Sequence, residues 1–460
     1  MAENSSSALS GEKLSIREMV SYGLPRFGSA AMFLAVGIYL PKFYTDTLLL
    51  APAFIAWTFL IGRFWDGFTD PIMGHISDRT RSKMGRRRPY FLVSAIPLGI
   101  AFYFLWSPPA ALKDWELFFY LTATYLLTYT FMTVFSIPHN SLGAEMTMDY
   151  HERTVLTGVR EGLGVSGTLV GTLAPPIFAV IIGSRQGGYS VMAGSIGILT
   201  AVLILFCFFN VRENPEFQKQ HPLALKKGLV ALYENRPFRV LVSVFVFALM
   251  GNAFVPILTL YIADYVVKIE PERVRVISSA VIVSYLLMAT VSIVFWTRLS
   301  HRIGKKEAWS YALILSSVVF VASTYYHEGT WVIWIILASI AGFGFGCTYA
   351  LAYSMMADVI DLDELQTGRR REGAYFGIWF FVEKGAVGLT AFIGMQTLSL
   401  MGYVPNQEQT PQVWWALKFL YSILPAICFA ACYFILRRYP ITQEEHARIR
   451  SEIEAKKAAS

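Results

Sequence analysis

Long apolar stretches separated by short polar segments run along the whole chain. A transmembrane helix needs about 20 mostly apolar residues, and windows that meet this requirement recur throughout the 460 residues. These twelve windows are 24–46, 53–77, 89–107, 116–140, 156–182, 190–210, 238–264, 275–297, 308–325, 331–356, 373–402 and 413–436. The pattern predicts an all-α membrane protein with twelve transmembrane helices, because a helix satisfies its backbone polar groups internally within a bilayer.

The longest polar connection divides the chain into two halves of six helices. It covers residues 211–237 and contains Asn-Pro, His-Pro and Arg-Pro dipeptides, which are typical of a linker. We expect an N-terminal six-helix bundle over 1–210, this linker, a C-terminal six-helix bundle over 238–436 and a cytoplasmic tail over 437–460. The basic loops after the second and eighth windows resemble each other weakly, as in transporters that are built from two similar halves.

Composition and charge agree with a membrane protein. Only 15% of the residues are charged, against about 25% in soluble proteins. The net charge of +7 comes from Lys and Arg in alternate loops, which indicates membrane topology rather than nucleic-acid binding. The positive-inside rule places these loops and both termini in the cytoplasm, so we expect a multi-pass protein of the cell inner membrane. The N-terminus lacks the pattern of a signal peptide, and the four cysteines lie in apolar windows without metal-ligand spacing.

The second window carries charges at membrane depth. Arg63, Asp66 and Asp70 follow at spacings of three and four, which places them on one face of a helix. Ionisable residues there are costly and indicate a functional site. With Thr69, the two carboxylates could supply oxygen ligands to Na⁺, or share a proton, because two close acids do not both ionise easily. The alternative is a salt bridge that only holds this helix to a neighbour, although buried ion pairs are a poor source of stability.

A second intramembrane charge is Lys384, near the middle of window 373–402. Its ammonium group cannot easily reach the membrane surface from there, so we expect it to face the interior and to meet Asp66 or Asp70. The neighbouring Glu383 points about 100° away, and it either bonds to a packed neighbour or has a functional role.

Polar residues recur along the fourth window and favour either the lining of a polar cavity or hydrogen bonds between helices. They are Tyr125, Thr128, Tyr129, Thr133, Ser136, His139 and Asn140. For His139 alone the hydrogen-bonding interpretation is favoured. Arg160, early in the fifth window, either reaches the cavity or anchors the cytoplasmic end of its helix.

Charged residues near the cytoplasmic face form a candidate gate. In the first half they are Asp78, Arg79 and Arg86, where charge–dipole contacts at helix ends are expected. In the second half they are Asp358 and Asp361, followed by Asp363, Glu364 and Arg369 to Arg371. Single surface pairs are weak, but a network could hold one state of an access cycle. The alternative is that the basic loop is only a topology signal.

Several strings resemble the glycoside–pentoside–hexuronide:cation symporter family of the major facilitator superfamily, which includes the melibiose permease. They are S-Y-G at 21–23, F-Y-T-D at 43–46, R-F-W-D-G-F-T-D-P-I-M-G at 63–74, D-R-T-R-S-K-M-G-R-R-R-P-Y at 78–90, I-P-H-N-S-L-G-A-E at 137–145 and M-A-D-V-I-D at 356–361. They occur in both halves of the chain. The resemblance implies two six-helix bundles and transport by alternating access.

The resemblance also assigns roles to single residues. It implies that Asp66 and Asp70 are the cation-site aspartates and that Thr133 is a hydroxyl ligand of the cation. It implies that Lys384, Arg63 and Arg160 lie beside this site.

The chain departs from the melibiose branch where that branch binds sugar. Ala30 and Ser136 replace two sugar-binding acids, Asn140 replaces a tryptophan, and Thr69 replaces an asparagine. The galactoside site is therefore not carried over, although the cation residues are. Eukaryotic members of this family include lysophospholipid carriers, which keeps an amphiphilic substrate open.

Together these observations predict a secondary transporter that couples Na⁺ or H⁺ to uptake of a sugar, glycoside or sugar acid; the alternative is a lysolipid or other amphiphile. Besides this coupling ion we expect no cofactor, and besides the solute and membrane lipid no partner, with a monomer as the working unit. The sequence shows no nucleophile–base set or phosphate loop, so we do not expect an enzyme. The residues expected to contact the substrate or couple it to the cation are Arg63, Tyr129, Ser136, Asn140, Arg160, Tyr349, Trp379 and Lys384.

Overall fold

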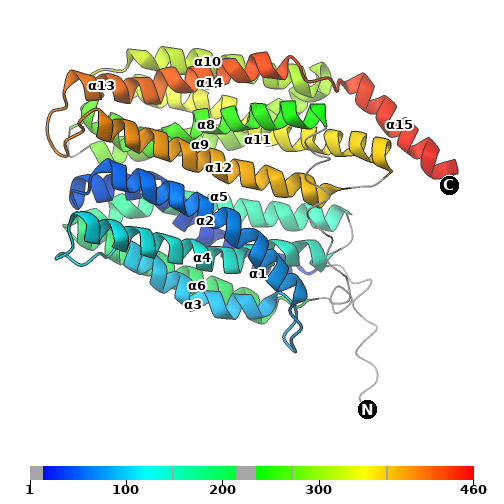
Figure 1. Cartoon of the computed structure of the whole chain (residues 1–460), viewed down its shortest axis with the longest axis horizontal. Helices are drawn as coiled ribbons and strands as arrows, with labels where there is room; N and C mark the ends of the chain where they lie inside the picture. The colour runs from blue at the N-terminus through cyan, green and yellow to red at the C-terminus, as the bar shows by residue number, and fades with distance from the viewer. Residues whose placement is uncertain (1–13, 148–149, 214–234, 271–272, 369–370, 460) are drawn as a thin grey trace. The chain divides into compact units, whose positions relative to one another are not determined.

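The computed structural model divides the chain into two compact units, Met1–Pro222 and Leu223–Ser460. The structure describes all residues except 1–13, 148–149, 214–234, 271–272, 369–370 and 460 (Figure 1). Most of the expected linker therefore lies outside the described residues, and the expected limits of the bundles, the linker and the tail stay predictions.

The first unit contains six membrane-length helices among its described residues. They are α1 Ile16–Lys42, α2 Pro52–Arg79, α3 Arg88–Leu105, α4 Asp114–Met146, α5 Tyr150–Ile181 and α6 Arg185–Asn210. A π-helical turn, Phe43–Thr47, continues α1. Within this unit α1 packs on α5 and α6, α3 packs on α4 and α6, and α2 packs on α4 (blue to green in Figure 1). The pairing of α2 with α4 brings two charged or polar helix faces together.

The second unit contains the remaining membrane-length segments and a C-terminal helix. They are α8 Arg236–Tyr265, α9 Val274–Ile303, α10 Lys305–Ala322, α11 Trp331–Thr367, α12 Glu372–Leu400, α13 Pro411–Lys418, α14 Leu424–Leu436 and α15 Gln443–Ala459. A π-helical turn, Phe419–Ile423, joins α13 and α14 into one span. Here α8 packs on α12 and α14, α9 on α11, and α10 on α11 and α14, while α15 (red in Figure 1) packs on α11.

The all-α membrane architecture is confirmed. Within the described part of the chain, 11 helices are long and apolar enough to cross a membrane. The helix α2 is the twelfth segment of that length, with 28 residues. It is less apolar than the other eleven, because Arg63, Asp66, Asp70 and Asp78 interrupt its apolar sequence. The most charged of the membrane-length helices is therefore also the one that carries the candidate cation site.

Most helices are longer than the apolar windows that predicted them. The helix α1 begins at Ile16, eight residues before the predicted start at 24, because Ser15 and Glu18 form a capping box that satisfies the first backbone N–H groups. The helix α11 continues to Thr367, past the predicted end at 356, and stops at Gly368, whose φ is +66°. An apolar window marks only the part of a helix that lies in hydrocarbon, whereas backbone hydrogen bonding continues into the polar regions.

Glycines set the closest helix contacts in each unit. A Cβ on Gly167 of α5 would lie 2.0 Å from the carbonyl oxygen of Phe27 on α1, and a Cβ on Gly171 would lie 2.4 Å from that of Ala31. In the second unit, Gly342 and Gly346 of α11 repeat this four-residue spacing against backbone carbonyls of α9. Small residues at this spacing let two membrane helices approach to backbone contact.

Candidate functional site

The structure gives a partner to each of the two acids near the middle of α2, Asp66 and Asp70. The Nη1 atom of Arg63 lies 3.2 Å from Oδ2 of Asp66, and their side chains are only 10% and 1% exposed. The Oδ1 atom of Asp70 accepts a hydrogen bond of 2.8 Å from the Thr133 hydroxyl of α4. Asp66 lies at the midpoint of α2 and Asp70 about 6 Å further along the axis. Near the middle of α2, each carboxylate thus has a polar partner, Arg63 for Asp66 and Thr133 for Asp70.

Close packing of α2 on α4 holds this arrangement. A Cβ on Gly62 would lie 2.3 Å from the Tyr125 ring, so the two helices approach closely just before Arg63. The indole N–H of Trp65 donates to the Thr130 hydroxyl at 2.8 Å. This contact adds one exposed hydrogen bond between the two helices.

One stripe of α4 carries the expected polar residues. Tyr129, Thr133, Ser136 and Asn140 follow at spacings of four, three and four, which is one face of a helix. The guanidinium of Arg63 lies over the Tyr129 ring at 5.4 Å. At the other end of the stripe, the side-chain amide oxygen of Asn140 accepts a hydrogen bond from Nη1 of Arg160 on α5 at 2.9 Å.

Two further residues of the predicted cation and substrate sets are Thr69 and Ser136. The Thr69 hydroxyl donates to the Trp65 carbonyl of its own helix at 3.0 Å. Ser136 is half-buried on the α4 stripe. Their assignments, like those of the other cation and substrate residues, stay predictions.

His139 serves helix packing. It is 2% exposed, stacks on Tyr22 of α1 at 4.4 Å, and its Nε2 lies 2.8 Å from the Tyr22 carbonyl oxygen. A carbonyl oxygen only accepts, so Nε2 is the donor. The hydrogen-bonding interpretation of His139 is confirmed.

The remaining predicted substrate residues belong to the second unit. Lys384 is half-buried on α12, and the prediction that it meets Asp66 or Asp70 stays a prediction. Trp379, on the same helix, is fully buried and stacked on Phe245 at 3.9 Å, whereas Tyr349 on α11 is 42% exposed. The Glu383 carboxylate accepts from the Tyr353 hydroxyl at 3.1 Å, which fits the prediction of a bond to a packed neighbour.

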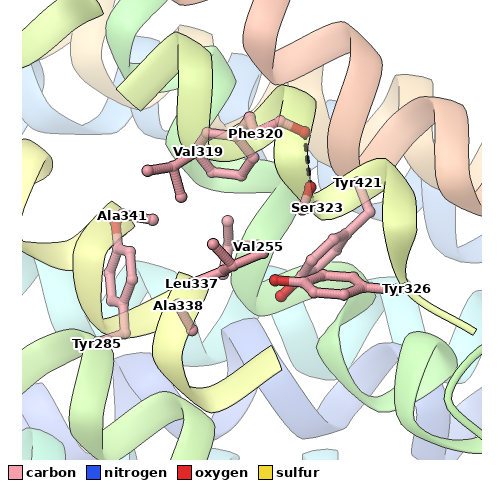
Figure 2. Close-up of a pocket in the computed structure, with 10 residues that line it drawn as sticks. All are labelled: Val255, Tyr285, Val319, Phe320, Ser323, Tyr326, Leu337, Ala338, Ala341 and Tyr421. Atoms are coloured by element: carbon pink, nitrogen blue, oxygen red, sulfur yellow. Dashed lines mark hydrogen bonds between the residues drawn. The ribbon is translucent and has the colours of Figure 1, made fainter. Parts of the chain in front are cut away.

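A small cavity lies within the second unit (Figure 2). It is lined by Val255, Tyr285, Val319, Phe320, Ser323, Tyr326, Leu337, Ala338, Ala341 and Tyr421. The Tyr285 hydroxyl donates to Asn252 at 2.7 Å, and the Tyr421 hydroxyl accepts from the Trp334 indole at 3.0 Å. Its lining includes none of the predicted substrate residues, and these two phenols already have partners, so we read it as a gap in packing.

The gate residues of the first unit form a compact ionic cluster. Arg86 and Arg87 both bind the Glu145 carboxylate of α4, at 2.7 Å and 3.0 Å. Arg87 also binds Asp78 at the end of α2, at 2.5 Å. Arg79 is exposed in the last turn of α2. The cluster thus ties the ends of α2 and α4 to the start of α3.

Glu213, just after α6, closes this cluster from the linker side. Its carboxylate accepts the backbone N–H groups of Arg86, Arg87 and Arg88 at 2.5 Å, 2.6 Å and 2.7 Å. These groups start α3, where a negative charge is favoured by the free N–H groups and the helix dipole. Gly85 makes the approach possible, because its φ is +108° and a Cβ there would lie 2.6 Å from the carboxylate carbon.

We expect Glu213→Ala to lower the free energy of unfolding by about 2 kcal/mol, because three charge-assisted hydrogen bonds are lost together. Thermal unfolding of the purified protein in detergent measures the change. The neighbouring exposed Arg212→Ala is the matched control and should change it by less than about 0.5 kcal/mol. Equal stability of the two variants would contradict a structural role for the carboxylate.

The gate acids of the second unit pair within that unit. Both Asp358 oxygens accept from Lys305 Nζ at 2.7 Å. Asp361 lies 3.2 Å from His446 Nε2 and 3.6 Å from Arg450, both on α15. Asp363 binds Arg371, and Arg369 and Arg370 lie outside the described residues. That these residues gate transport stays a prediction.

Sequence reasoning missed Glu213, His446 and Arg26 as site residues. Glu213 is an acid directly after a basic residue at the end of an apolar window, and Arg26 is a base inside another window. Both could therefore have been recognised from their neighbours in the sequence. His446 could not, because its partners Asp358 and Asp361 are more than 80 residues away.

These features define a polytopic membrane protein of the transporter class, in which one charged helix carries a buried carboxylate, Asp66, and a half-buried one, Asp70. A sequence profile described as MFS/sugar transport protein matches residues 21–443, and the chain belongs to this family.

Individual relatives cover almost the whole chain. The uncharacterized symporter YjmB of Bacillus subtilis is 27% identical over 97% of this chain and 96% of its own. The isoprimeverose transporter of Lactiplantibacillus pentosus is 25% identical over 96% and 92%. The sodium-dependent lysophosphatidylcholine symporter 1 of Gallus gallus is 26% identical over 95% and 88%.

Solved transporter structures share the fold. A bacterial homologue of the human lysosomal transporter Spinster matches with a TM-score of 0.67 and 12% identity, over 92% of this chain and 96% of its own. The nucleoside transporter NupG matches with a TM-score of 0.65 and 12% identity, over 92% and 100%. This likeness concerns the fold alone, and the family match carries the assignment to transporters.

Proposed function

We propose that the protein is a symporter of the cell inner membrane that couples Na⁺ or H⁺ to uptake of a sugar, glycoside or sugar acid by alternating access. The observation that carries the proposal is the pair Asp66 and Asp70 at the centre of a membrane span, joined to Thr133 of α4. Charges at this depth are costly and persist where they bind an ion or a solute. Relatives named as symporters and as an isoprimeverose transporter support the same class.

The cation site would comprise Asp66, Asp70, Thr133 and Thr69. A cation bound there offsets the negative charge of the two carboxylates and would release or reorient Lys384. A substrate site that includes Tyr129 and Asn140 on the α4 stripe would then be favoured. Since each ligand stabilises the state that the other prefers, cation and substrate would raise each other's affinity by the same factor.

The topology belongs to the same proposal. The basic loops between the spans support cytoplasmic placement of both termini by the positive-inside rule. The ionic clusters around Arg86 and Asp358 would then lie on the cytoplasmic face, where they would help to close one state of the cycle.

A second candidate is cation-coupled transport of a lysolipid. The specific observation in its favour is the relative named as a sodium-dependent lysophosphatidylcholine symporter, which aligns with 95% of this chain. The same cation residues would serve both candidates, which therefore differ only in the substrate.

Thermal stabilisation of the purified protein by ligands tests the proposal. The panel contains neutral sugars, sugar acids and lysolipids, each with Na⁺, with K⁺ and at two pH values. We expect a Na⁺- or pH-dependent rise in Tm for one sugar class and none for lysolipids. A cation-dependent rise for lysolipids alone would select the second candidate, and the absence of any cation-dependent rise would contradict symport.

A further inference from the structure

Two arginines of the first unit share a single carboxylate. Glu161 Oε1 accepts from Nη2 and Nε of Arg160 at 2.6 Å and 2.9 Å. Its Oε2 lies 3.6 Å from Nε of Arg26 on α1. Asn140 of α4 accepts from the third edge of the Arg160 guanidinium. This group, the Arg26–Arg160 cluster, has one more positive than negative charge and draws on α1, α4 and α5.

The arginines of the cluster lie inside two candidate membrane spans, and the cluster is open rather than packed. Arg26 is about 8 Å from the midpoint of the candidate span Ile16–Thr47, and Arg160 is about 12 Å from the midpoint of the candidate span Val155–Ile181. Hydrocarbon extends about 15 Å to either side of the membrane centre. The side chains of Arg26 and Glu161 are nevertheless 44% and 46% exposed. Charged groups exposed at this depth face water or a solute, because lipid contact is costly.

The helix backbones are shaped to hold the two arginines together. A Cβ on Gly23 would lie 3.2 Å from Cα of Arg160, and a Cβ on Gly164 would lie 3.1 Å from Cγ of Arg26. Each arginine therefore lies against a glycine of the opposite helix. Two other titratable groups lie nearby: the Tyr22 hydroxyl accepts from Nη1 of Arg160 at 3.4 Å, and His139 bonds to the Tyr22 carbonyl. A neutral phenol and an imidazole supply no negative charge, so neither neutralises the cluster.

Guanidinium groups bind carboxylates and phosphates through paired hydrogen bonds, and the single carboxylate of Glu161 is divided between two of them. The contact between Glu161 and Arg26 is the longer one, at 3.6 Å. The Arg26 guanidinium can therefore still donate hydrogen bonds to another anion. The amide of Asn140, exposed beside Arg160, presents a further N–H donor.

We propose that the Arg26–Arg160 cluster recognises an anionic group of the transported solute, a carboxylate or a phosphate, and that Glu161 competes with it for the arginines. The inference rests on the proposed transport function and names the substrate class. The cluster is joined to the cation site through α4, since Asn140 and Thr133 lie seven residues apart on one face, about 10 Å along the axis. Arg26 is the residue that decides specificity, and Arg160 positions Glu161 and Asn140 around it.

Matched ligands test this, each pair differing only in the anionic group. One pair is a methyl glucuronide and the methyl glucoside, and the other is a lysophosphatidate and the monoacylglycerol of the same chain. Binding to the full-length protein is measured by titration with the coupling cation present, and uptake is measured in proteoliposomes. The response of the sugar pair or of the lipid pair identifies the source of the anion.

Two variants should act in opposite directions. Arg26→Gln should weaken binding of the acidic ligand roughly tenfold or more and leave the neutral ligand unchanged. Glu161→Gln should raise the affinity for the acidic ligand several-fold, because the competing carboxylate is removed. A purely structural role would weaken binding in both variants. Arg17→Gln is the matched control, since Arg17 on the same helix binds Asn210 outside the cluster.

The outcomes separate this inference from the function on which it rests. If a neutral ligand is transported with cation coupling and neither variant discriminates acid from neutral, this inference is wrong and symport stands. If no ligand of either pair, nor any of the wider panel, shows cation-dependent binding or uptake, the proposed function fails and this inference with it.

Discussion

Asp70→Ala should abolish cation-stimulated uptake and reduce it to the level without a cation gradient. The carboxylate accepts from Thr133 and is one of two acids at the centre of α2, so its loss removes half of the charge that would attract the cation. Asp66→Asn should have the same effect. We prefer it to Asp66→Ala, because the amide oxygen still accepts from the buried Arg63, which would otherwise lose its partner at a large cost in stability. Uptake into proteoliposomes with and without an inward Na⁺ or H⁺ gradient measures both variants.

Hydroxyl deletions provide the matched comparison for this result. Thr133→Val should weaken the apparent affinity for the cation by roughly tenfold, since one of the oxygens beside Asp70 is removed. Thr130→Val removes a hydroxyl three residues away on α4, which bonds only Trp65 and its own helix, and should leave the cation affinity unchanged. If cation coupling survives in both aspartate variants, Asp66 and Asp70 are not the cation site.

Gly167→Val should lower the free energy of unfolding by about 3 kcal/mol or more, because the new side chain would overlap backbone atoms that cannot rotate away. The carbonyl oxygen of Phe27 lies 2.0 Å from the position of the added Cβ. The contact between α1 and α5 would have to separate, and with it the cluster of Arg26 and Arg160. The yield of monodisperse protein in detergent and its Tm measure the effect.

A glycine of the same helix without such a neighbour is the control. Gly158 has no atom within 4 Å of an added Cβ, and Gly158→Val should cost only the small difference expected at an exposed helix position. Similar losses at both positions would show that the helix itself, rather than its contact with α1, is sensitive to substitution.

The membrane fold was largely predictable because burial in a bilayer imposes a local rule. Every span must be a long apolar helix, so a window of fixed length finds it without reference to any other part of the chain. Helix ends were less predictable. The start of α1 depends on the capping box of Ser15 and Glu18, and the end of α11 depends on Gly368, which lie outside the apolar windows.

The candidate site was predictable where its residues shared a helix face. The order Arg63, Asp66, Asp70 on α2 and Tyr129, Thr133, Ser136, Asn140 on α4 follows from helix geometry alone. Helix geometry does not predict which carboxylate of α2 bonds to which hydroxyl of α4. That choice depends on the rotation of α2 against α4, which is limited by the close approach of Gly62 to Tyr125.

The amino-acid sequence alone determined the class of the protein, its all-helical membrane fold and the charges that lie within its apolar windows. The tertiary structure alone decided the partners of those charges: Asp70 with Thr133, Glu213 with the start of α3, and Arg26 with Arg160 through Glu161. The physical reason is that hydrophobicity is a property of each residue and its helix, whereas an ion pair depends on the distance between side chains from separate helices.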